Sequence, residues 1–192
     1  MRLFLAVFPS LEAQELAHAA GGAVRRGAEA AGVSARAVSW VKRENLHYTL
    51  RFIGEVGEDG ARRIEEAAFE AAKAEPAFDA VLGAPGAFPS ARRARVLWLG
   101  LAEGSGALVR LAAMLERALA RRGFAPEGRP FAPHLTLGRV RESGDFSVAL
   151  DGAASLAREP GARFPVRAIA VVTSTLSPAG SRYDIRAEAA LA

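Results

Sequence analysis

The chain has 192 residues, of which 51% are hydrophobic and 24% are charged, and its formal net charge is +4. This balance is typical of a globular protein and excludes a disordered chain, so we expect one domain over residues 1–192. The absence of cysteine excludes disulfides, zinc–thiolate sites and a cysteine nucleophile. No apolar run reaches the roughly 18 residues of a membrane span, and no signal-peptide cleavage site is present, so we expect a cytoplasmic protein.

Strands and helices alternate along the chain without a long polar linker. The predicted strands are Leu3–Phe8, Val38–Val41, 46–54, Phe78–Leu82, Val96–Leu101, 133–139, Arg163–Thr175 and Arg182–Ala189. The predicted helices are Ser10–Glu29, Asp59–Ala74, Ser105–Gly123 and Ser147–Leu156, with Ser10, Asp59 and Ser105 as capping residues. A turn is predicted at residues 177–180. This order indicates an α+β fold.

The pattern His-x-Thr occurs twice, at His47–Thr49 and at His134–Thr136, each time within a predicted strand. Side chains in a strand alternate between its faces, so the histidine and threonine of each copy point the same way. The chain has only three histidines, and two of them lie in this pattern. The repeat predicts an internally duplicated, bilobal fold. We expect two mainly antiparallel sheets with outer helices, and a central groove across which the histidine strands face each other.

Two imidazoles at one site can supply a base and an acid near neutral pH. The hydroxyls of Thr49 and Thr136 can donate hydrogen bonds to phosphate oxygens held between them, an arrangement that suits in-line attack at phosphorus. No metal site and no cofactor are predicted, because neither strand contains an acidic residue and no nucleotide-binding motif is present.

Two arginines are candidates for phosphate binding, because the guanidinium group forms paired hydrogen bonds with phosphate. Arg51 shares the face of His47 and Thr49 by simple alternation. Arg139 falls on the face opposite His134 by the same rule, and a bulge at Gly138 would turn it back. Without a bulge, Arg139 is a solvated residue at a strand end. The aromatic residues considered for base stacking are Trp40, Tyr48, Phe88, Trp98 and Tyr183.

The chain resembles the two-histidine (2H) phosphoesterase superfamily, and within it the RNA 2',3'-cyclic phosphodiesterase or 2'-5' RNA ligase family. The resemblance spans nearly the whole chain. It is carried by Arg2–Val7, Trp40–Gly54, Gly86–Ser90, Arg95–Gly100 and Arg129–Arg139. One departure is Tyr48, where an aliphatic residue is common.

The resemblance implies metal-independent hydrolysis of an RNA 2',3'-cyclic phosphate to a 2'-phosphomonoester. His47 and His134 are then the catalytic pair, Thr49 and Thr136 hold the phosphate, and Arg139 is the family's arginine after the second motif. By analogy, His134 activates water and His47 protonates the leaving oxygen. Reversal of the reaction would give a minor 2'-5' ligation activity.

The expected partner is RNA with a cyclic phosphate end, including tRNA-derived ends, or a small cyclic nucleotide, bound by a monomer that does not contact membranes. Two alternatives remain open from the sequence. One is a phosphodiesterase for a small cyclic phosphate such as ADP-ribose 1'',2''-cyclic phosphate. The other is a non-catalytic nucleotide- or RNA-binding domain, although binding alone does not require two imidazoles.

Overall fold

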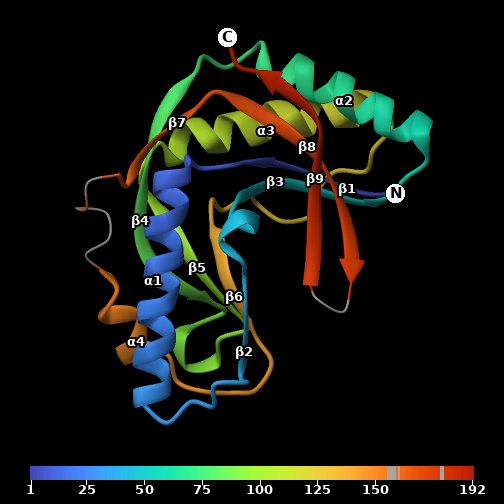
Figure 1. Ribbon diagram of the computed structural model, residues 1–192. Coiled ribbons are helices and arrows are strands. Elements are labelled where there is room, and N and C mark those ends of the chain that lie inside the picture. The colour runs from blue at the N-terminus through green and yellow to red at the C-terminus, as the bar shows by residue number, and fades with distance from the viewer. Residues whose placement is uncertain (155–158, 160, 178–179) are drawn as a thin grey trace.

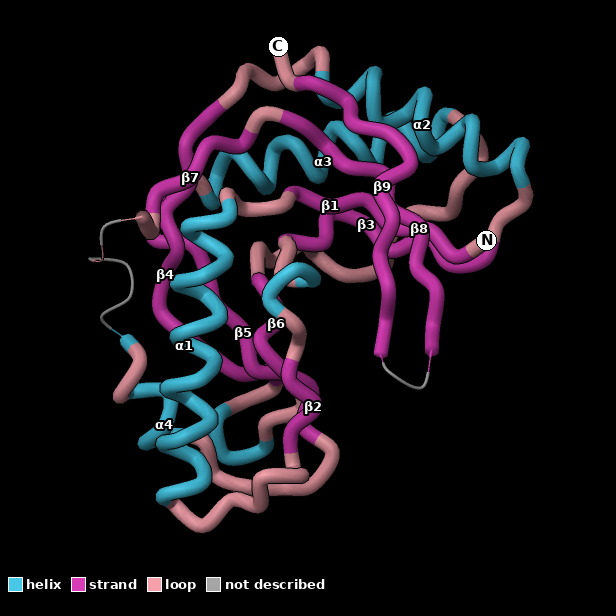
Figure 2. Tube along the Cα trace, viewed as in Figure 1, coloured by secondary structure: helices cyan, strands magenta, loops and turns pink. Residues whose placement is uncertain are grey.

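The computed structural model describes residues 1–154, 159, 161–177 and 180–192, and within these it contains nine strands and four α-helices (Figures 1 and 2). The strands are β1 (Arg2–Val7), β2 (Val38–Trp40), β3 (Tyr48–Glu55), β4 (Phe78–Phe88), β5 (Val96–Glu103), β6 (Leu135–Val140), β7 (Arg163–Val166), β8 (Ala168–Ser177) and β9 (Gly180–Ala190). The α-helices are α1 (Leu11–Ala30), α2 (Glu58–Ala72), α3 (Ser105–Arg121) and α4 (Ser147–Asp151), and two short 3₁₀ helices are η1 (Arg43–Asn45) and η2 (Ala91–Arg93).

The strands form one curled antiparallel sheet with the order β7-β4-β5-β6-β3-β1-β8-β9, and β2 pairs with β6 beside β3. The expectation of two separate sheets is therefore wrong. The two halves are joined where β3 and β6 pair at Tyr48 and Leu135, the residues that follow the two motif histidines. Sequence alternation defines each strand but not its neighbours, so it could not reveal that the two histidine strands lie side by side.

The helices cover one face of this sheet. Helices α1 and α4 pack together beside the half that contains β4 and β6, whereas α2 and α3 pack beside β3, β8 and β9 (Figure 1). Alternate residues of β1 divide between the two faces: Leu3 and Leu5 belong to the main core, and Phe4 and Ala6 belong to a small second cluster on the other face. Burial of a leucine side chain contributes about 1.5–3 kcal/mol, so the helix-covered core is the main source of stability.

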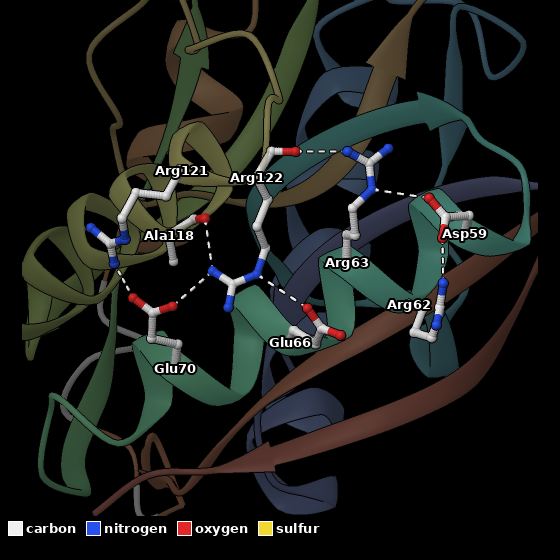
Figure 3. Close-up of polar contacts among 8 residues, drawn as sticks. All are labelled: Asp59, Arg62, Arg63, Glu66, Glu70, Ala118, Arg121 and Arg122. Atoms are coloured by element: carbon white, nitrogen blue, oxygen red, sulfur yellow. Dashed lines mark hydrogen bonds and ion pairs between the residues drawn. The ribbon is translucent and has the colours of Figure 1, made fainter.

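Ion pairs join α2 to α3 on the outside of the molecule (Figure 3). Arg122 lies 2.7 Å from Glu70 and 3.6 Å from Glu66, and Glu70 also binds Arg121. Arg63 donates a hydrogen bond of 2.8 Å to the carbonyl oxygen of Arg122. Exposed pairs contribute about 0–1 kcal/mol each, so this network fixes the alignment of two helices that are already held by their apolar faces.

Most predicted elements are present, with shifted ends. The Ser10 cap is confirmed, since its hydroxyl accepts a hydrogen bond of 3.3 Å from the Ala13 amide. The other two predicted caps are wrong, because Gly57 and Gly104 occupy those positions and Asp59 and Ser105 lie in the first turns. The last helix ends at Asp151, and the rest of its predicted range partly lies outside the described residues. The centre of the predicted turn at 177–180 also lies outside them.

The predicted strand Arg163–Thr175 is two strands. β7 pairs with β4 at one edge of the sheet, whereas β8 pairs with β1 and β9 near the other edge. The break falls at Arg167. Apolar alternation continues through this position, so the sequence pattern could not show that the chain passes from one end of the sheet to the other.

Candidate active site

The two His-x-Thr motifs lie side by side across the β3–β6 junction. Tyr48 pairs with Leu135 in an antiparallel ladder, and this register sets His47 opposite Thr136 and Thr49 opposite His134. Residues directly opposite each other share a face of the sheet. We call the face that carries the two motifs the histidine face; it is the face away from the helices.

The same backbone contact orients both imidazoles. Nδ1 of His47 lies 2.7 Å from the carbonyl oxygen of Asn45, and Nδ1 of His134 lies 2.8 Å from that of Ala132. A carbonyl oxygen only accepts hydrogen bonds, so each Nδ1 carries the proton. Each neutral ring then has its lone pair on Nε2. In His47 this nitrogen lies 2.9 Å from the Thr49 hydroxyl.

His47 is enclosed by aromatic rings. The ring centres of Phe4, Phe8 and Tyr183 lie 4.8, 5.5 and 5.4 Å from that of the imidazole. Burial in this setting lowers the pKa of His47 to about 4, and repulsion from Arg139 and His134 acts in the same direction, against the hydrogen bond to Asn45, which raises it. His47 is therefore neutral at pH 7 in the free protein.

His134 stands beside a second pair of aromatic residues. The ring of Phe88 meets that of His134 edge to face, with 5.2 Å between centres, and lies 4.9 Å from the ring of Trp98. Trp98 is directly opposite Thr136 in the β5–β6 ladder. Its buried indole nitrogen has no hydrogen-bond partner within the described residues. The two histidines thus have different surroundings, although their backbone contacts are alike.

A β-bulge in β6 turns Arg139 onto the histidine face. Trp98 pairs with Thr136 and Leu97 with Gly138, which leaves Leu137 as the extra residue. After this bulge Arg139 shares the face of Thr136, close enough for its charge to lower the pKa of His47. Gly138 is required here, because a Cβ atom would come 2.6 Å from Cγ1 of Val38.

A second bulge, in β3, turns Arg51 away. Ala6 pairs with Thr49 and Leu5 with Arg51, so Leu50 is the extra residue and Arg51 faces the helices. Its guanidinium lies 3.2 Å from Glu116 and 3.2 Å from Glu127, and its side chain is only 11% exposed. The expectation that Arg51 shares the face of His47 is wrong, because simple alternation assumes a strand without a bulge.

This site can be compared with those of known proteins. The sequence matches the family profile of the 2'-5' RNA ligase superfamily over residues 14–177. The chain belongs to this superfamily. The RNA 2',3'-cyclic phosphodiesterase of Archaeoglobus fulgidus is 39% identical over 159 residues, which are 82% of this chain and 86% of the relative. The enzyme of that name from Methanothermobacter thermautotrophicus is 34% identical over 146 residues, covering 76% of this chain and 78% of the relative.

Solved structures agree with this assignment to the 2'-5' RNA ligase superfamily. The protein TT0787 of Thermus thermophilus superposes with a TM-score of 0.77 at 29% identity, over 100% of this chain and 98% of that chain. LigT of E. coli, solved in complex with 3'-AMP, gives a TM-score of 0.68 at 25% identity, over 99% of this chain and 97% of that chain. The curled sheet and its helices are thus those of known superfamily members.

Several residues of this superfamily member's site were not predicted from the sequence. The backbone carbonyl oxygen of Asn45 accepts the hydrogen bond from Nδ1 of His47. The side-chain amide of Asn45 donates a hydrogen bond of 2.8 Å to the carbonyl oxygen of Ser181 in β9. Phe4 of β1 and Phe8, which follows the end of β1, flank the His47 ring. Of the aromatic candidates, Phe88, Trp98 and Tyr183 border the motifs, whereas Tyr48 is fully buried in the main core.

No group of three or more His, Cys, Asp or Glu side chains is arranged to hold a metal ion among the described residues. A cavity of about 130 Å³ lies beside α1 and Trp40, but it includes neither motif histidine. No helix in the described part of the chain is long and apolar enough to cross a membrane.

Proposed function

We propose that this superfamily member hydrolyses RNA 2',3'-cyclic phosphate ends to 2'-phosphomonoesters without a metal ion. The observation that carries the proposal is the register of β3 and β6, which sets two equally anchored imidazoles and two threonine hydroxyls on one face. The names of the relatives support the same reaction. Non-catalytic binding would not require two histidines that are both held through Nδ1, an arrangement that leaves the proton-transfer role to Nε2.

In the proposed mechanism the cyclic phosphate sits between His47 and His134. His134 takes a proton from water, and the water oxygen forms a bond to phosphorus. The bond from phosphorus to O3' breaks on the opposite side, and His47 gives its proton to O3'. Thr49 and Thr136 donate hydrogen bonds to the non-bridging oxygens. Arg139 stabilises the negative charge that develops on them.

The acid role requires His47 to be protonated in the complex, although it is neutral in the free protein. The negative charge of the bound phosphate supplies this change. Burial is the main cause of the low pKa of His47, followed by repulsion from Arg139 and His134, and a phosphate anion beside the ring acts against both because it stabilises the imidazolium. Proton uptake on substrate binding is therefore part of the proposal.

The same geometry supports further proposals of smaller scope. Reversal of the reaction joins a cyclic phosphate end to a 5'-hydroxyl as a 2'-5' link, and it stays minor because water is in large excess. The antiparallel pairing of the two motifs supports an internal duplication of the chain. A monomeric state, a cytoplasmic location and tRNA-derived substrates remain predictions.

The proposal predicts that hydrolysis continues in excess EDTA. The test compares a short RNA ending in a 2',3'-cyclic phosphate with ADP-ribose 1'',2''-cyclic phosphate, each assayed with and without EDTA. We expect equal rates with and without the chelator and a higher kcat/KM for the RNA. Complete loss in EDTA that one divalent ion restores would contradict the mechanism, and preference for the ADP-ribose compound would support the alternative substrate.

A further inference from the structure

The histidine face extends beyond Arg139 to a second arginine. Ser39 of β2 pairs directly with Arg139 of β6, so the two side chains share this face. Arg141 follows the end of β6, and its Nη2 donates a hydrogen bond of 3.2 Å to the Ser39 hydroxyl. Arg139, Ser39 and Arg141 therefore form one continuous stretch that begins next to Thr136. We call Ser39 and Arg141 the distal pair.

Both arginines of this stretch are exposed and lack an acidic partner within the described residues. Several arginines elsewhere are instead neutralised by carboxylates: Arg122 lies between Glu66 and Glu70, and Arg186 is bound by Glu58 and Glu65. Two neighbouring guanidinium groups without a carboxylate repel each other, and a bound anion relieves this repulsion. The charge pattern therefore favours a ligand with more than one negative group.

The spacing and the hydrogen bond both fit a phosphodiester. Two residues along an extended chain span about 7 Å, which is comparable with the separation of neighbouring phosphates in a nucleic-acid strand. The Ser39 oxygen accepts a hydrogen bond from Arg141, so its own O–H remains available as a donor. Arg141 and Ser39 can then bind two oxygens of one phosphate, as a guanidinium and a hydroxyl commonly do.

We propose that the distal pair binds the phosphodiester that precedes the cyclic phosphate in an RNA strand. The inference rests on the proposed function. It makes the protein selective for cyclic-ended oligonucleotides over a mononucleoside 2',3'-cyclic phosphate, which lacks that phosphodiester. Arg139 then binds the cyclic phosphate, and Arg141 binds the phosphodiester that precedes it.

The test measures kcat/KM for uridine 2',3'-cyclic phosphate and for a uridine trinucleotide with the same end, in wild type, Arg141→Gln and Ser39→Ala. We expect Arg141→Gln to lower the ratio of trinucleotide to mononucleotide kcat/KM about fivefold, the scale of one charge-assisted phosphate contact. Ser39→Ala should lower it by a smaller factor. The matched control is Arg117→Gln, which removes an equal charge from an exposed position on α3, on the helix side of the sheet.

Salt dependence separates a phosphate contact from a structural effect. For the trinucleotide, kcat/KM falls with rising salt, and the negative slope of log kcat/KM against log salt concentration should become shallower by about 0.7 in Arg141→Gln. Arg141→Lys should restore that slope, because the charge returns. An unchanged ratio and slope in Arg141→Gln, with wild-type activity intact on both substrates, would overturn this inference alone. Wild-type protein inactive on both substrates would instead overturn the proposed function.

Discussion

Alanine in place of either His47 or His134 should lower kcat/KM on a cyclic-ended RNA by about 10²–10⁴-fold, the usual contribution of one general acid or base. Each side chain is bound to its own backbone two residues earlier and stands on the histidine face outside the main core. Both variants should therefore keep the wild-type circular dichroism spectrum. Steady-state kinetics of the two purified variants measure the effect. Near-normal rates in both would remove the two-histidine mechanism.

A substrate with an activated leaving group distinguishes the two roles. Bis(4-nitrophenyl) phosphate releases a weakly basic phenolate that needs little protonation, so it should rescue His47→Ala, the proposed acid, more than His134→Ala. Greater rescue of His134→Ala would reverse the assignment. In the wild type, the pH profile of kcat/KM on RNA should change slope near pH 4, where His47 of the free protein takes up its proton. This change of slope should be absent from the His47→Ala profile.

Replacing Arg139 by alanine should cost about 2–4 kcal/mol at the transition state, or roughly 30- to 1000-fold in kcat/KM, as for other preorganised donors. The reason is the bulge at Leu137, which brings this guanidinium to the face of Thr136. Its removal should also raise the pKa of His47, because the charge of Arg139 lowers it. Kinetics and an NMR titration of the imidazole measure the two effects.

The control for Arg139 is Arg139→Lys, which keeps the charge but not the paired hydrogen bonds. It should hold the pKa of His47 near the wild-type value and recover only part of the rate. Normal kinetics in Arg139→Ala, together with an unchanged His47 titration, would show instead that Arg139 is a solvated residue at the end of a strand.

The motif residues could be predicted from the sequence because the evidence for them is local. In each motif the histidine stands directly before a strand and the threonine lies two residues later within it, and the register sets both pairs on one face. The helices were also predictable, since each carries a buried apolar stripe. What alternation could not give was pairing between strands that are distant in the chain, and this is why one sheet was predicted as two.

The two arginines show most clearly where local reasoning fails. Alternation set Arg51 on the histidine face and Arg139 off it, and a bulge in each strand reverses both positions. Gly138 gave a signal for one bulge, because a glycine within a strand often marks a close approach. Leu50 gave none, since it is an ordinary buried strand residue in every other respect. The aromatic enclosure of His47 depends on β1 and β9, which meet it only in the folded sheet.

The most direct test of the account is the identity of the product. Purified protein is incubated in excess EDTA with a short RNA that ends in a 2',3'-cyclic phosphate, and the terminal phosphate is followed by ³¹P NMR. The account predicts a single product with a 2'-phosphomonoester and a free 3'-hydroxyl. A 3'-phosphate, or a cyclic end that stays intact while the RNA binds, would contradict it.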